Sequence, residues 1–160
     1  MTLEIGHQHH AELLPHVDAL RVLADDIAQA DGTVLRARLD TELRFIRQQL
    51  VPHMEMAERS LYPQLQQLLE DPRAMAPMER EHREIRRLIV AAEAIRDRIG
   101  DAIISLHDEL QLRRILYRLF VLMRVHLAEE ERYLAIIDRN APDLLESLVA
   151  GMRHPTMEPL

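Results

Sequence analysis

Four long segments of this chain repeat apolar residues at the spacing of an α-helix, and only short turn signals separate them. The chain has just 4 Gly and 3% aromatic residues, a composition that favours helix over sheet. Long helices joined by short turns predict an all-α fold, an antiparallel up-down four-helix bundle followed by a short C-terminal helix or tail. The predicted helices run from about His9 to Ala30, from between Thr33 and Asp40 to Leu69, from between Met75 and Met78 to just before Gly100, and from Ser105 to Asn140.

Turn signals and prolines mark the first two predicted helices. Gly32 is expected to cap the end of the first helix, and Thr33 to cap the start of the second. Pro52 and Pro63 fall inside the second helix. Each should kink it, because proline lacks the backbone donor that an α-helix requires.

The C-terminal half of the chain has equally clear boundaries. Ser105 and Asp108 form a capping-box pattern at the start of the fourth predicted helix. Residues 1–152 are expected to form one domain, with a short fifth helix over 143–152. A loose tail is expected over 153–160.

The composition excludes several classes of function. No cysteine is present, so any metal must be bound by His and carboxylate ligands, which suit iron, manganese or zinc. A net charge of −7 lacks the basic footprint of a nucleic-acid-binding protein. Neither a signal peptide nor an 18-residue apolar span is recognisable, so we expect no membrane partner and a cytoplasmic location.

His126 and Glu130 are four residues apart, so they share one face of the fourth predicted helix. Met123 and Leu134 lie on the same face, which places both polar groups in the core. A buried carboxylate and a buried imidazole are costly without partners. A metal ion would compensate both groups, and a simple His–Glu hydrogen bond is the alternative.

Histidines on the other three predicted helices also point inward. His82 lies on the apolar stripe of the third helix, and His53 lies on the inward side of the second. His9, His10 and His16 all lie near the inward stripe of the first helix, and helical geometry does not choose among them. A lone core histidine is usually structural. Histidines on all four helices would crowd a common interior, where bundles assemble His/carboxylate metal sites.

Four short segments carry a family resemblance in their order and spacing: His10-Ala11-Glu12-Leu13-Leu14, His53 with Leu61-Tyr62-Pro63, Glu81-His82-Arg83-Glu84-Ile85, and His126-Leu127-Ala128-Glu129-Glu130-Glu131. Over roughly residues 7–138 the chain resembles the hemerythrin-like, or HHE cation-binding, domain. The resemblance implies a four-helix bundle that binds a non-haem di-iron centre through histidines and two bridging carboxylates. The ligands that it implies are His53, His82, His126 and Glu130, with His10 and His16 both candidates from the first helix.

One position departs from the family pattern. The family motif H-x-x-x-E places a carboxylate four residues after His53, where this chain has Ala57. Loss of this bridging carboxylate weakens a di-iron site, so the centre could hold one metal or a labile second one. Glu58, Glu81 and Glu12 are near enough to compensate, and Glu58 is retained as a candidate ligand.

The resulting expectation is a hemerythrin-like non-haem iron protein that binds or senses O₂ or a related diatomic ligand such as NO. One alternative is a peroxidase-like or NO-handling enzyme at the same metal. The other is a degenerate bundle that holds no metal and acts through protein contacts. The lost carboxylate, and the lack of a separate acid or base group, favour a binding protein over an enzyme. A homodimer is a possible assembly.

Overall fold

The computed structural model describes residues 2–99 and 104–143, with side chains from residue 10 onward. All regular structure within these ranges is helical, which confirms the predicted all-α class. Residues 144–152 of the predicted fifth helix and the predicted tail over 153–160 lie outside the described residues. The elements are α1 (Thr2–Asp26), the 3₁₀ segment η1 (Ile27–Gln29), α2 (Gly32–Phe45), the π-helical segment η2 (Ile46–Leu50), α3 (Val51–Met56), the π-helical segment η3 (Ala57–Leu61), α4 (Tyr62–Leu68), α5 (Ala76–Arg96) and α6 (Leu106–Asn140).

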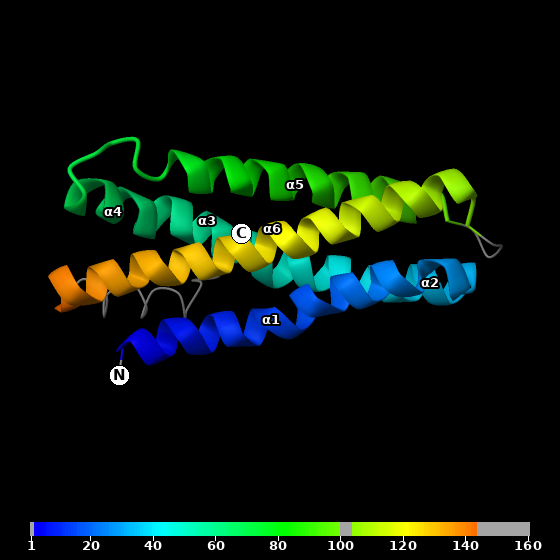
Figure 1. The fold of residues 1–160 in the computed structure, drawn as a ribbon, viewed down its shortest axis with the longest axis horizontal. Helices are drawn as coiled ribbons and strands as arrows, with labels where there is room; N and C mark the ends of the chain where they lie inside the picture. The colour runs from blue at the N-terminus through cyan, green and yellow to red at the C-terminus, as the bar shows by residue number, and fades with distance from the viewer. Residues whose placement is uncertain (1, 100–103, 144–160) are drawn as a thin grey trace, which may run out of the picture.

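The helices lie lengthwise beside one another (Figure 1). Helix α6 packs against both α1 and α5, and α2 also packs against these two helices. The start of α1 and the end of α6 lie at the same end of the molecule (Figure 1), so the histidine-bearing parts of these helices are close together. Among the described helices, none combines the length and the apolar character needed to cross a membrane.

The turn between α1 and α2 differs from the prediction. Asp31, not Thr33, is the N-cap of α2, because its side chain accepts a hydrogen bond from the Thr33 backbone N–H at 2.9 Å. Gly32 is the first residue of α2 and does not cap α1. Since α1 ends through the 3₁₀ segment η1, the turn needs no left-handed glycine. Ser105 caps α6 as predicted and accepts from the Asp108 backbone N–H at 3.1 Å.

The prolines of the second helical run are accommodated by π-helical segments. Segment η2 ends two residues before Pro52, and η3 ends two residues before Pro63. At the end of η2, the Val51 N–H bonds to the carbonyl of Ile46, five residues back. This wider turn leaves room for the proline ring. It also tolerates the absence of the backbone hydrogen bond that proline cannot donate. The run therefore continues through both prolines from α2 to α4.

Apolar side chains in two clusters fill the interior of the described part of the chain. The larger cluster draws on α1, α2, α3, α5 and α6 and includes Met54 and Met123. The smaller one, at the end where α4 meets α6, includes Ala57 and Leu134. The buried polar side chains of the described residues lie where these clusters meet, and they are His10, His53, His82, His126 and Glu130. Because burying polar groups is costly without partners, this junction is the candidate site.

Candidate metal centre

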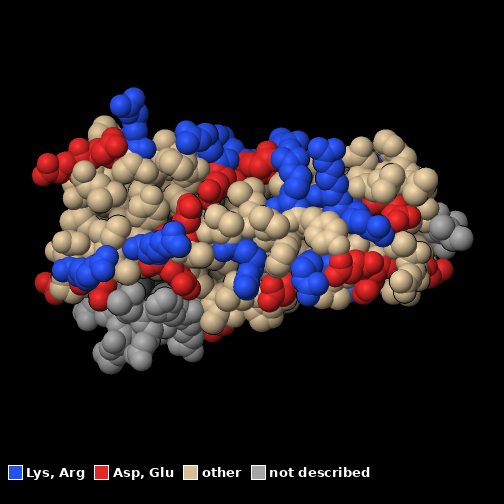
Figure 2. Space-filling view, viewed as in Figure 1, with Lys and Arg blue, Asp and Glu red and all other residues tan. Residues whose placement is uncertain are grey.

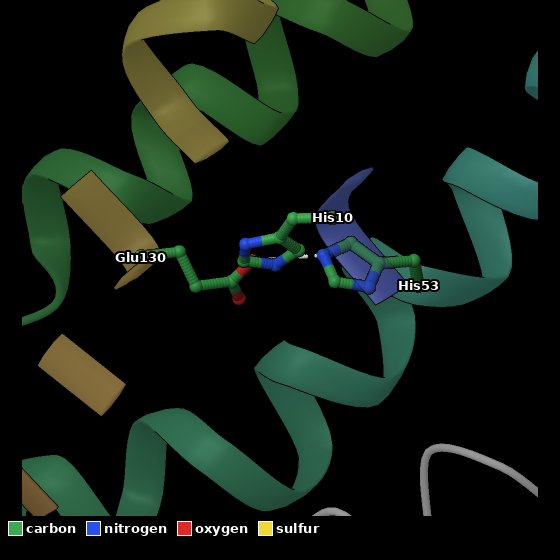
Figure 3. A group of neighbouring side chains, drawn as sticks. All are labelled: His10, His53 and Glu130. Carbon is green, nitrogen blue, oxygen red and sulfur yellow. Dashed lines mark hydrogen bonds and ion pairs between the residues drawn. The ribbon is translucent and has the colours of Figure 1, made fainter. Parts of the chain in front are cut away.

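Three of the buried side chains form a compact group where α1, α3 and α6 meet (Figure 3). We call His10, His53 and Glu130 the triad. The Nε2 atom of His53 lies 2.8 Å from Oε2 of Glu130, and Nε2 of His10 lies 3.1 Å from the same oxygen. Candidate ligand atoms from all three residues lie within 4.8 Å of one another, so one metal ion could contact them all.

Glu130 is an ionised carboxylate in the interior of the protein. Burial favours its neutral acid, but His53 and His10 outweigh burial and hold the pKa of Glu130 well below its usual range. Burial also opposes the charged form of His53, yet the charge and hydrogen bond of Glu130 raise the pKa of that histidine. The second oxygen of Glu130, Oε1, is buried with no hydrogen-bond partner among the described residues. An ionised carboxylate with an unsatisfied buried oxygen fits a cation.

His82 of α5 and His126 of α6 form a second group, which we call the histidine pair. Their Nε2 atoms face each other at a distance of 2.9 Å. Carboxylates lie behind both rings: Oε1 of Glu58 is 2.8 Å from Nδ1 of His82, and Oε2 of Glu81 is 2.9 Å from Nδ1 of His126. Because a carboxylate accepts hydrogen bonds, each Nδ1 carries the ring proton and each Nε2 has a lone pair.

The two facing lone pairs leave a place for a positive charge. Burial and the neighbouring His126 lower the pKa of His82 to about 4. Burial also lowers the pKa of His126, against the opposing effect of Glu130. Neither ring therefore holds a second proton near neutral pH. Two neutral acceptors cannot hydrogen-bond to each other, so a metal cation fits this arrangement as well.

Tyr62, the first residue of α4, also belongs to the site. Its hydroxyl lies 3.2 Å from Nε2 of His82, and the two rings are stacked with centroids 5.5 Å apart. Burial, reinforced by the charge of Glu130, raises the pKa of Tyr62, so the phenol stays protonated and donates to Nε2 of His82 when no metal occupies that lone pair. A tyrosine nine residues after His53 gave no signal that separated this role from packing.

The space expected for the missing carboxylate is apolar. Ala57 is fully buried and belongs to the smaller apolar cluster. Glu58 and Glu81 reach the histidine pair only from its outer side, and Glu12 is exposed. Glu130 is thus the sole buried carboxylate within the described ranges, and nothing there replaces the one lost at position 57.

Of the helix-one candidates, His10 is the one that joins the triad. His16 instead lies 3.1 Å from Glu42 and stacks on Phe45, with ring centroids 3.6 Å apart. Its side chain is 39% exposed, away from the buried groups. The side chain of His9 lies outside the described residues.

The fold and these two groups define an all-helical protein with a buried His/carboxylate centre suited to a cation. The family model of the hemerythrin HHE cation binding domain matches residues 1–135, and the chain belongs to this family. No curated protein and no solved structure matches the chain significantly. Family membership implies binding of a metal cation, and the triad is a possible site for it.

Proposed function

We propose that this protein is a hemerythrin-like non-haem iron protein that binds or senses O₂ or a related diatomic ligand such as NO. In this proposal the helices form an antiparallel up-down four-helix bundle with the iron in its core. The observation that carries the proposal is the pair of facing Nε2 lone pairs on His82 and His126, close to the ionised carboxylate of Glu130. Buried groups of this kind are compensated most simply by a metal cation.

The ligand set favours iron at two adjoining positions. The triad supplies two imidazoles and a carboxylate, and the histidine pair supplies two more imidazoles. Oxygen and nitrogen ligands without thiolate suit iron, with manganese and zinc as competitors. The charge of Glu130 acts on both groups, since it favours the charged forms of His53 and His126 alike. We expect the position at the triad to bind more tightly, because only the triad contains a carboxylate.

Iron held here would supply a redox-active Lewis acid to which a diatomic ligand binds. The chain itself supplies dry surroundings, since Met54 and Met123 are buried beside the ligand-bearing turns of α3 and α6. Ala57 is small, and Tyr62 presents a hydroxyl to the same region. An apolar enclosure with few polar groups suits a small uncharged ligand better than a polar substrate.

Metal analysis tests the proposal directly. Protein purified under mild conditions is expected to contain iron in excess of manganese, and an anomalous map should place the metal at the triad. Added Fe²⁺ should raise the melting temperature, because a ligand that binds only the folded state stabilises it by about 2.7 kcal/mol at 100 times its Kd. His126→Ala should lose the metal held by the histidine pair and keep the metal held by the triad. Protein that contains no metal and gains no stability from Fe²⁺ would contradict the proposal.

The ligand is tested on anaerobic ferrous protein. Exposure to O₂ or NO should change the absorption spectrum reversibly. Steady turnover of peroxide or NO faster than free iron achieves would instead support the enzyme alternative.

A further inference from the structure

Two separate sets of hydrogen bonds lie on the outer side of the histidine pair. Arg86 of α5 donates from Nη1 to Oε1 and from Nη2 to Oε2 of Glu58, at 2.9 and 3.1 Å. Glu58 of η3 in turn lies 2.8 Å from Nδ1 of His82 on α5. Glu81 of α5 lies 2.9 Å from Nδ1 of His126 on α6. Each histidine is therefore held from behind by a carboxylate of a different helical element.

These contacts decide which ring nitrogen of His82 carries the proton. In a neutral imidazole one nitrogen donates and the other accepts. An ionised carboxylate only accepts, so Glu58 keeps the proton of His82 on Nδ1. Nε2 is then a lone pair directed at the space shared with His126. With the proton on Nε2, His82 could not bind a metal on its inner side.

Arg86 fixes the position of Glu58 itself. A two-point contact between guanidinium and carboxylate is specific in geometry, and it engages both oxygens of Glu58. A carboxylate held in this way does not turn inward. This explains why Glu58 lies behind His82 and does not replace the carboxylate absent at Ala57.

We propose that Glu58, clamped by Arg86, is a positioning residue that keeps His82 in its metal-binding tautomer, and that Glu81 does the same for His126. The proposal rests on the proposed metal-binding function. Independently of metal binding, it also predicts that the ring proton of His82 lies on Nδ1 in the metal-free protein. Carboxylates behind metal-binding histidines typically contribute about 10–100-fold to metal affinity.

The tautomer is measured by ¹⁵N NMR of the metal-free protein. In the wild type, His82 is expected to carry its proton on Nδ1. Glu58→Leu removes the acceptor, and the proton should then move to Nε2. A wild-type His82 with its proton on Nε2 would overturn the proposal, whether or not the protein binds iron and whether or not the variant folds.

Competition for Fe²⁺ against a chelator measures how much Glu58 contributes to metal affinity. At the histidine pair, the weaker of the two positions, Glu58→Leu should bind Fe²⁺ about 10–100-fold more weakly than the wild type, whereas the affinity of the triad should stay unchanged. Glu58→Gln keeps an acceptor oxygen for Nδ1 and should retain most of the affinity. Glu84→Leu is the control, because the hydrogen bonds of Glu84 among the described residues are with Arg87 and Arg118 at the surface.

The outcomes separate the two proposals. Wild-type affinity of the histidine pair in a folded Glu58→Leu variant would overturn the positioning role while leaving the iron site intact. A wild type that binds no Fe²⁺ would overturn the proposed function, and the NMR result would still decide the role of Glu58.

Discussion

The triad and the histidine pair share α6, but only the triad has a carboxylate on the inner side of its imidazole rings. In the triad, Glu130 lies on the inner side and contacts both His10 and His53. In the histidine pair, Glu58 and Glu81 lie behind the rings. A carboxylate on the inner side adds charge to a metal site, whereas one on the outer side orients a neutral ligand. The same residue types therefore give two unequal halves of one centre.

The surroundings of Glu130 differ from those of the charged residues at the surface of the molecule. Arginines and acidic residues are interspersed over the face shown in Figure 2, where they can be solvated. Glu130 has no such access to water, and only its neighbours can compensate its charge. This contrast identifies Glu130 as the residue on which the difference between the two groups depends most.

Glu130→Ala is expected to have the largest effect of any single change. The metal-free protein should lose about 3–5 kcal/mol of stability, because His53 and His10 would lose their buried partner. Iron should be lost from the triad as well. Urea unfolding of the metal-free protein and iron analysis measure both effects. Glu129→Ala, at the adjacent half-buried position, is the control. Wild-type stability and iron content in Glu130→Ala would contradict the claim that the carboxylate of Glu130 distinguishes the triad from the histidine pair.

Ala57→Glu tests whether a second inner carboxylate makes the two halves more equal. The metal-free variant should lose about 1–3 kcal/mol from overpacking, with a further loss from burying a charge. Added Fe²⁺ should then raise its melting temperature by more than it raises that of the wild type. Ala57→Gln, of equal size and no charge, should suffer the packing loss without the larger response. Equal responses in the two variants would show that the added charge does not reach the metal.

Tyr62→Phe should affect the histidine pair but not the triad. It removes the hydroxyl beside Nε2 of His82, a loss of about 0.5–1.5 kcal/mol of stability. The fraction of iron that resists a chelator should stay unchanged if the triad holds it. Tyr133→Phe is the control, because Tyr133 is a partly buried tyrosine that packs against the smaller cluster. Equal losses in both variants, measured by urea unfolding, would mean that Tyr62 acts only by packing.

Local sequence patterns were enough to predict most of the fold. Helical spacing and capping residues act within one or two turns, so the extent of α6 and its cap at Ser105 followed from the sequence. The π-helical segments could not be predicted from such local patterns. Pro52 and Pro63 indicated a disturbance of the second helical run, but its form depends on how that run packs against its neighbours.

The candidate site was also predictable only as far as local helical spacing determines it. Helical spacing alone placed the histidines of α3, α5 and α6 toward the interior. The outer position of Glu58 did not follow, because it depends on Arg86, which α5 brings to it from 28 residues further along the chain. Nor could spacing choose between His10 and His16, since that choice depends on how far α1 is shifted along its axis relative to α3.

The smallest expected effect therefore belongs to His16, and it tests the composition of the triad. His16→Ala should leave the iron content unchanged and cost at most about 1 kcal/mol, since it removes only a partly exposed contact with Glu42 and a stack on Phe45. His10→Ala should release iron from the triad, because a buried imidazole beside Glu130 is lost. Iron analysis of the two variants side by side measures the difference. If His16→Ala released as much iron as His10→Ala, α1 would have to present both histidines to the metal, and the triad as defined would be wrong.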